Sequence, residues 1–321
     1  MDRLTQLQQW LETLAVNTYS DLTVASADAS FRQYFRVTNT QENKTYIVMD
    51  APPEKEDCHP FVQVTELIRS CGVNAPDIIA LDLHQGFLLL DDLGDTPYLD
   101  LLNNDTAEQL YIDAIDALIK MQSIDALLPA YNEKLLQTEL DLFETWYLNR
   151  HLNVQLNENQ KQALHAVFTL LIRNAEEQPQ VFVHRDYHSR NLMLSEINNP
   201  GVIDYQDAVI GPITYDLVSL FKDCYIEWPP EKVEHWLDLY LARITPDFFI
   251  EKPTLMRWFD LMGVQRHLKV LGIFSRLNYR DSKTQYLDDL PLTLKYVVDA
   301  CEKYIELQPL QQLLEETRGK N

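Results

Sequence analysis

The stretch VFVHRDYHSRNLML at residues 181–194 places charged and amide side chains between two short apolar runs. Charged groups cost free energy near a protein core unless something pairs with them, so a loop of this composition predicts a chemical role. Asp186 and Asn191 lie in this loop, and Asp204 follows in VIDYQD, after an Asn-Pro-Gly turn. Strand, loop and strand in this order place the three oxygen-bearing side chains at the edges of one small hairpin system.

These three side chains suit phosphoryl transfer. Asn191 and Asp204 offer hard oxygen ligands of the kind that Mg²⁺ takes beside water and phosphate oxygens. Asp186 precedes them and can accept a hydrogen bond from an attacking hydroxyl. Positioning and charge neutralisation supply most of the rate in this reaction, and the set predicts that division of labour.

The two histidines of the loop, His184 and His188, have other expected roles. They are four residues apart, but they lie in a loop between strands rather than on a helix, so no zinc pair is expected. His184 is expected to be structural and to pin the loop through backbone hydrogen bonds.

The predicted elements around this loop change from mainly β to mainly helical near residue 94. Before it, one helical stretch at 60–72 stands among β-like runs at 31–39, 44–51, 77–83 and 86–94. After it, helical periodicity dominates, and short β runs interrupt it only at 180–186, 191–194 and 201–206. We therefore expect an α+β protein with a β-rich N-lobe over residues 1–93 and a helical C-lobe over residues 94–321. No linker or repeat separates the two lobes.

Composition limits the possible classes of function. Asp and Glu number 49 against 27 Lys and Arg, a formal charge of −22, which argues against nucleic acid or an anionic membrane as partner. The four cysteines show no Cys-x-x-Cys spacing, so neither a disulfide framework nor a thiolate zinc site is expected. Residues 1–15 read as an amphipathic helix rather than an apolar signal core. We expect a cytoplasmic protein with no obligate protein partner.

HRDYHSRN followed by VIDYQDAVIGPITYDLVSL resembles the catalytic loop and metal-binding segment of the aminoglycoside phosphotransferase family, small-molecule relatives of the protein kinases. ADASFRQYFRV, MDAPPEKEDC, GFLLLDDLGD and RHLKVLGIFSRLNYRDSK are similar, in this order, to one branch of that family. That branch phosphorylates the anomeric hydroxyl of N-acetylmuramate and N-acetylglucosamine in peptidoglycan recycling. The resemblance covers most of the chain. It implies a protein-kinase-like bilobal fold, a small antiparallel N-lobe with one main helix, ATP and Mg²⁺ as cofactors, and a sugar 1-phosphate as product.

The resemblance also implies roles for individual residues. Asp186 corresponds to the catalytic base or hydroxyl-orienting group, and Asn191 and Asp204 to the Mg²⁺ ligands. Asp216, in GPITYDL, is expected to cap the start of a helix. The residues expected at the substrate are His188, Arg190, Asp207, Arg276 and Arg280. The residues expected at the nucleotide are Ser30, Phe31, Arg32, Leu89, Leu90 and Asp91.

The nucleotide side departs from the kinase pattern. The sequence contains no Gly-x-Gly-x-x-Gly, and SADASFRQYF occupies the position of that loop. Its small side chains and the Ser30 hydroxyl could still let backbone amides approach phosphates. The strand that carries a lysine in kinases reads YIVMDAPPEK and has none before its end. The cations that could take its place are Arg32, Arg36 and Lys55.

Alternative functions stay open on these data. Aminoglycosides are polycations, so net charge alone favours an aminoglycoside or other small-alcohol kinase. The basic stretch VQRHLKVLGIFSRLNYRDSK favours a neutral or anionic amino sugar instead, and Arg276 and Arg280 are preferred in it because aromatic and amide groups flank them. Ion pairing with neighbouring helices explains the same charges equally well. The missing lysine and glycine loop also leave open a nucleotide-binding pseudokinase scaffold.

Overall fold

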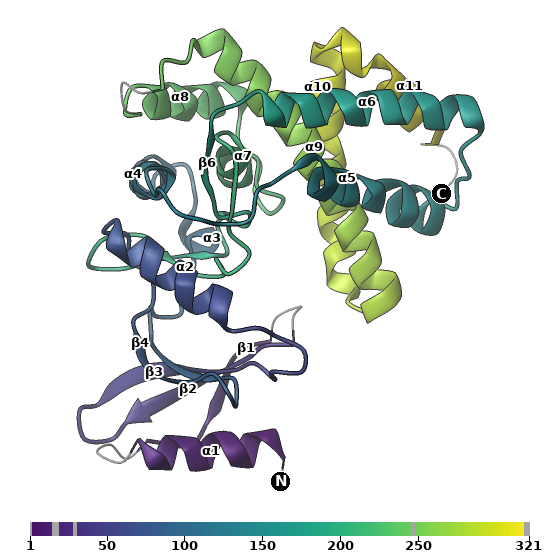
Figure 1. Cartoon of the computed structure of the whole chain (residues 1–321). Helices are drawn as coiled ribbons and strands as arrows, with labels where there is room; N and C mark the ends of the chain where they lie inside the picture. Colours follow the sequence, from purple (N-terminus) through teal and green to yellow (C-terminus); the bar gives the residue numbers. More distant parts are fainter. Residues whose placement is uncertain (1, 15–18, 28–30, 245–247, 318–321) are drawn as a thin grey trace. The chain divides into compact units, whose positions relative to one another are not determined.

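The computed structural model describes residues 2–14, 19–27, 31–244 and 248–317 (Figure 1). The chain packs as two compact units: Met1–Leu101 with Asn191–Asp207, and Leu102–Arg190 with Ala208–Asn321. The first unit therefore runs past residue 93 and takes in a later segment, because that segment forms bridges with it, Asn74 with Gly201 and Pro97 with Met193. The lobe assignment at residues 1–93 and 94–321 stays a prediction.

The elements of each unit follow the chain. The first unit contains α1 (Arg3–Thr13), β1 (Thr23–Ala27), β2 (Gln33–Asn39), β3 (Lys44–Asp50), α2 (His59–Ser70), β4 (Ile78–Asp82), β5 (Phe87–Asp91), α3 (Tyr98–Leu101), β7 (Leu192–Met193) and β8 (Gly201–Val202). The second contains α4 (Ala107–Gln122), α5 (Glu133–Leu142), the π-helical η1 (Phe143–His151), α6 (Glu158–Glu176), β6 (Gln180–Val183), β9 (Val209–Pro212), α7 (Tyr215–Phe221), α8 (Pro230–Leu241), α9 (Lys252–Asp281), the 3₁₀ segments η2 (Thr284–Asp289) and η3 (Ile305–Leu307), α10 (Leu290–Lys303) and α11 (Gln308–Thr317). None of the helices in the described ranges is long and apolar enough to span a membrane.

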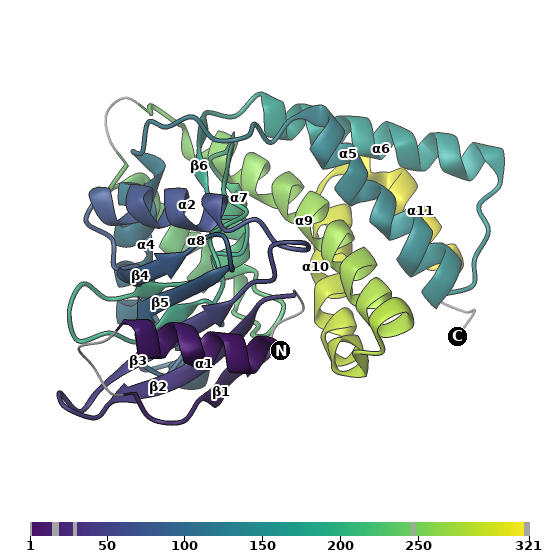
Figure 2. The same cartoon turned by 60° about the horizontal axis from the view of Figure 1, so that its bottom comes forward.

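The first unit is built on one antiparallel sheet with strand order β1-β2-β3-β5-β4. Helices α1 and α2 lie on opposite faces of it (Figures 1 and 2). On the α1 side, Leu7, Trp10 and Leu11 pack in one apolar cluster with strand residues that include Tyr46 and Val48. Successive side chains of a strand alternate between faces, so Met49 faces the other side of the sheet.

The second unit is organised around α9, the longest helix, which packs against α5, α6, α7, α10 and η1 (Figure 2). Gly272 is needed at one of these crossings, because a Cβ atom there would lie 2.4 Å from the carbonyl carbon of Leu142. The absence of a side chain at this position lets α9 approach the end of α5 closely. Helix α9 therefore holds side chains of its middle turns, Gln265 and Lys269 among them, near α5 and α7.

Candidate active site

The loop that follows β6 is held by a buried carboxylate. The backbone N–H groups of His184 and Arg185 donate to the two oxygens of Asp216, at 2.7 and 3.0 Å. Arg185 has φ of 77°, a left-handed conformation that is uncommon for residues other than glycine and often marks functional sites. The backbone N–H of Asp186 donates to Nδ1 of His184 at 3.2 Å, which confirms the predicted role of this histidine.

The expected role of Asp216 as a helix cap is wrong. Helix α7 begins at Tyr215 with Thr214 in the cap position, and Asp216 lies inside the first turn. Its side chain accepts from the β6 loop instead, because two backbone N–H groups converge on it there. Burial raises the pKa of Asp216 to about 7, against the lowering effect of the two backbone hydrogen bonds.

Replacing Asp216 by Ala should lower the free energy of unfolding by at least about 2 kcal/mol, because each buried N–H left without an acceptor costs roughly 1–3 kcal/mol. Urea unfolding followed by circular dichroism measures this loss, with the exposed Asp125→Ala as control. Equal stability of the two variants would contradict the assigned role.

The raised pKa of Asp216 also predicts a pH dependence. The folded carboxyl binds a proton more tightly than the unfolded one, and this difference adds to the free energy of unfolding. The added stability is complete below pH 3.8 and is lost as the pH rises towards about 7. Asp216→Asn cannot titrate and should remove this contribution, which unfolding curves of both proteins at pH 5 and pH 7 would show. The same difference in stability between pH 5 and pH 7 in both proteins would contradict this prediction.

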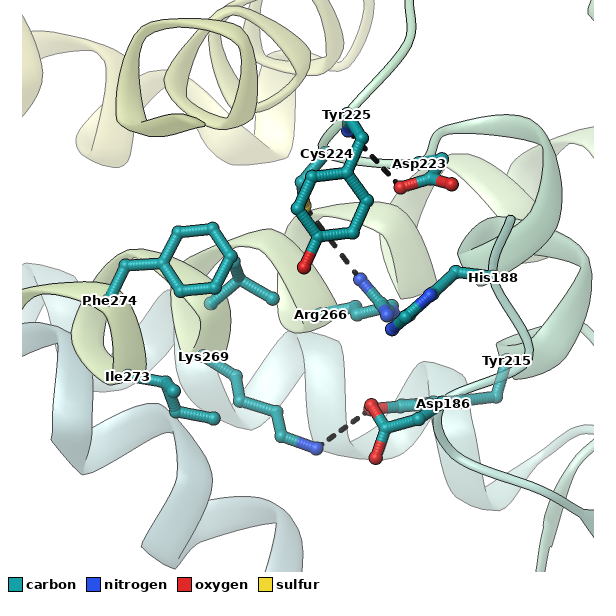
Figure 3. A pocket seen from close by; sticks show the side chains of 11 residues that line it. Asp186, His188, Tyr215, Asp223, Cys224, Tyr225, Arg266, Lys269, Ile273 and Phe274 are labelled. Carbon is teal, nitrogen blue, oxygen red and sulfur yellow. Dashed lines mark hydrogen bonds between the residues drawn. The ribbon is translucent and has the colours of Figure 1, made fainter. Parts of the chain in front are cut away.

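A pocket opens beside the loop within the second unit (Figure 3). Asp186 and His188 come from the loop, Tyr215 from α7, and Asp223, Cys224 and Tyr225 from the segment after α7. Helix α9 contributes Arg266, Lys269, Val270, Ile273 and Phe274. The α9 residues have the spacing i, i+3, i+4, i+7 and i+8, so one face of the helix forms this wall. The pocket therefore combines two carboxylates, two cations and an apolar, partly aromatic wall.

The carboxyl of Asp186 is electrostatically suited to be a base. Burial alone would raise its pKa, but the positive charges of Lys269, Arg266 and Arg185 keep the pKa below its ordinary value. Burial lowers the pKa of His188 itself, which favours the neutral imidazole. Asp186 therefore carries a negative charge at neutral pH and can accept a proton.

The two expected metal ligands lie together in the first unit. Nδ2 of Asn191 donates to Oδ2 of Asp204 at 3.2 Å, and Nε2 of Gln206 donates to Oδ1 of Asp204 at 2.9 Å. Asp204 also has a left-handed backbone, with φ of 64°. No group of three His, Cys, Asp or Glu side chains in the described ranges could hold a metal. One carboxylate and one amide oxygen nevertheless fit Mg²⁺, which usually keeps water and phosphate oxygens as its other ligands.

The residues expected at the glycine-loop position are placed only in part. Ser30 lies outside the described residues. Phe31 is exposed, its N–H donates to Glu56 at 3.2 Å, and its ring lies 4.4 Å from Nζ of Lys55. Arg32 is buried and forms an ion pair with Glu56 at 3.1 Å. Their contact with a nucleotide stays a prediction.

The remaining residues expected at the nucleotide lie at the end of β5. Leu89 and Leu90 are buried in this strand, and Asp91 ends it in an ion pair with Lys44 at 2.9 Å. Just beyond, Asp92 accepts from Arg36 at 2.6 Å. Arg36 and Arg32 are thus both engaged with carboxylates, and the cation that serves in place of the kinase lysine stays a prediction.

The residues expected at the acceptor are mostly outside the pocket. His188 lines it, whereas Arg190 is exposed, with its guanidinium 3.6 Å from the ring centre of Tyr225, and Asp207 is exposed too. Arg276 is half-buried, and Arg280 is exposed and pairs with the adjacent Asp281 at 2.8 Å. Their role in binding the acceptor stays a prediction.

The α9 cations in the pocket are Arg266 and Lys269 rather than the preferred Arg276 and Arg280. Arg280 lies eleven residues after Lys269, about 16 Å further along the helix axis. The sequence shows the helical spacing of the α9 residues that line the pocket. It does not show which turn of α9 packs against the loop. Tyr215, Asp223 and residues 224–225 were missed for the same reason.

A small antiparallel sheet, a helical second unit and a polar loop with a partly buried carboxylate are typical parts of a kinase-like phosphotransferase. The phosphotransferase enzyme family matches residues 21–252 of the chain. The chain belongs to this family. The predicted family, enzyme class and kinase-like α+β fold are thereby confirmed.

Relatives and solved structures agree with this assignment. The chain is 46% identical to the N-acetylmuramate/N-acetylglucosamine kinase of Pseudomonas aeruginosa, over 97% of this chain and 96% of that protein. It is 40% identical to the protein of the same name from Neisseria meningitidis, over 99% of this chain and 97% of that protein. The choline kinase of Streptococcus pneumoniae has a similar fold, with a TM-score of 0.66 at 14% identity, covering 92% of this chain and 98% of that one. The ethanolamine kinase of Plasmodium vivax gives 0.65 at 11% identity, covering 94% and 95%.

Proposed function

We propose that the protein is an ATP-dependent sugar kinase that phosphorylates the anomeric hydroxyl of N-acetylmuramate and N-acetylglucosamine. The observation that carries this proposal is the pocket in which the Asp186 carboxylate lies with Lys269 and Arg266. The relatives at 46% and 40% identity, named as kinases of these two sugars, support the choice of acceptor. Peptidoglycan recycling in the cytoplasm, where ATP is abundant, is the corresponding role.

The chemistry follows from the side chains of the loop. Asp186 accepts the proton of the sugar hydroxyl, whose oxygen attacks the γ-phosphorus of ATP in line, and ADP leaves. No covalent enzyme intermediate is required. Asn191 and Asp204 would hold Mg²⁺, which neutralises charge on the phosphate oxygens when bound.

The pocket's own charges offer no excess of negative charge to a polycationic acceptor. Two cations, Lys269 and Arg266, line it beside two carboxylates, Asp186 and Asp223, and fields of exposed charges elsewhere on the acidic chain are screened over about 10 Å. A polycationic antibiotic would meet these two cations at short range. Tyr225 and Phe274 provide apolar surface for the body of a sugar.

An acceptor panel tests this proposal. ADP release would be measured with ATP and Mg²⁺ and with N-acetylmuramate, N-acetylglucosamine, glucose, choline or kanamycin. Turnover with the two N-acetyl sugars, and little with the others, is the expected result. Turnover with kanamycin or choline alone would show that the acceptor is an aminoglycoside or another small alcohol rather than a sugar. ATP binding without turnover on any acceptor would favour the scaffold alternative.

Arg32 is our choice for a phosphate-binding cation, because it is a buried cation directly before β2, which pairs with β3, the strand that carries a lysine in kinases. Arg32→Met should raise KM for ATP roughly 10-fold or more, the loss of one charge-assisted hydrogen bond, without changing KM for the sugar. Arg173→Met on the exposed side of α6 is the control. An unchanged KM for ATP would exclude Arg32.

A further inference from the structure

Glu139 of α5 is a buried carboxylate that accepts hydrogen bonds from four side chains. The donors are Lys269 at 3.0 Å, Arg185 at 2.5 Å, Gln265 at 3.3 Å and the hydroxyl of Tyr131. Glu139 is only 4% exposed, so this network is shielded from water. The positive charges of Lys269 and Arg185 lower the pKa of Glu139 against the effect of burial, and Glu139 is therefore ionised.

The charges of this network do not balance by themselves. One negative charge on Glu139 faces two positive charges, on Arg185 and Lys269. Lys269 lines the pocket, whose carboxylates are Asp186 and Asp223, and its charge is the largest of the positive charges that lower the pKa of Asp186. The network thus extends to the reactive group.

The ammonium group of Lys269 has one donor left for a ligand. Of its three N–H bonds, one is directed to Glu139 and another to the hydroxyl of Tyr215 at 2.9 Å. Within the described ranges no third acceptor lies within hydrogen-bonding distance. Figure 3 shows the side chain of Lys269 extending along the pocket to the same end as Asp186. An oxygen atom bound next to Asp186 would lie close to this ammonium group.

The stability of the fold does not by itself account for the burial of Lys269 together with Glu139. Taking an ammonium and a carboxylate out of water costs several kcal/mol per ion, and apolar replacements of buried ion pairs are often neutral or stabilising. Lys269 is only 7% exposed, yet it lines a pocket. A cation held rigidly beside a base is, in contrast, a common device for stabilising charge that develops during a reaction.

We propose that Lys269 is a second catalytic residue, whose free N–H donates to the oxygen of the sugar hydroxyl that is phosphorylated. This inference rests on the proposed function. As the O–H bond breaks, the proton passes to Asp186; the oxygen–phosphorus bond forms, and the bond from phosphorus to ADP breaks. Lys269 keeps its proton throughout and stabilises the negative charge that develops on the oxygen. Glu139 is the positioning residue that holds Lys269 in place.

The test compares Lys269→Met with Lys134→Met, an exposed control on α5. Lys269→Met should lower kcat roughly 100-fold or more, the usual effect of removing one stabilising donor, with KM for ATP unchanged. The acid limb of kcat/KM should also move to higher pH, because Asp186 loses a cation that lowers its pKa. Neither change is expected in Lys134→Met.

Two further results separate this inference from its alternatives. If the wild-type protein transfers phosphate to the sugars but Lys269→Met keeps kcat and the acid limb, the inference is wrong and the proposed function stands. If the wild-type protein shows no transfer to sugars, the proposed function itself fails. If Lys269→Met does not fold, Lys269→Gln decides instead, because it keeps an N–H donor towards Glu139 but loses the positive charge: a large loss of kcat at an unchanged unfolding midpoint supports the inference, and unchanged kcat overturns it.

Discussion

Replacing Asp186 by Asn should lower kcat by about 10²–10⁴-fold, the usual contribution of a general base, while the protein still folds and binds ATP. The amide has nearly the shape of the carboxylate but cannot take up the hydroxyl proton. Lys269 and Arg266 keep the pKa of the native carboxyl below its ordinary value, so the wild-type base is already ionised at neutral pH. The loss should therefore be the same at every pH between 6 and 8.

The measurement is steady-state ADP release at saturating ATP and sugar, with ATP binding followed by calorimetry. Asp125→Asn, at an exposed position of the same unit, controls for the general effect of removing a carboxylate. Full activity in Asp186→Asn would remove Asp186 from the mechanism and leave Asp223 and His188 as the other possible bases of the pocket.

Replacing Asp204 by Asn should have the second largest effect, a loss of kcat of roughly 100-fold or more, because removing the charge weakens the Mg²⁺ site that neutralises the phosphates. Asp204 is the carboxylate of the Asn191–Asp204 pair, and an amide is a weaker ligand for a hard cation. The variant should also need more Mg²⁺ for half-maximal rate.

Calorimetric titration of ATP with and without Mg²⁺ provides a readout independent of turnover. In the wild-type protein Mg²⁺ should strengthen ATP binding, and in Asp204→Asn most of this gain should disappear. Asp100→Asn, an exposed position in the same unit, should retain it. A gain from Mg²⁺ as large in Asp204→Asn as in the wild type would contradict the assignment of this ligand.

The sequence predicts the fold well where the local pattern is strong. The periodicity of residues 107–122 predicts a helix, and α4 has these bounds, because its apolar residues recur on one face and bury it. Strand β9 was missed because VIGP contains a glycine and a proline, which are weak strand formers, and it is tertiary pairing with β6 that makes it a strand.

The candidate site was predictable only where neighbours in sequence make it. The hairpin brings Asn191 and Asp204 together because β7 and β8 pair directly. Glu139 carried no local signal, since it is one of 49 acidic residues, and its role depends on the close approach of α9 to α5. The role of Asp216 likewise depends on where α7 meets the β6 loop, which spacing alone does not reveal.

The central claim, transfer of phosphate to an anomeric hydroxyl, is tested most directly by the product. Wild-type protein would be incubated with ATP, Mg²⁺ and N-acetylmuramate, and the sugar phosphate examined by phosphorus NMR with proton coupling. Coupling of the phosphorus to the proton on the anomeric carbon is the predicted result. Phosphate at any other hydroxyl of the sugar, or no sugar phosphate at all, would contradict it.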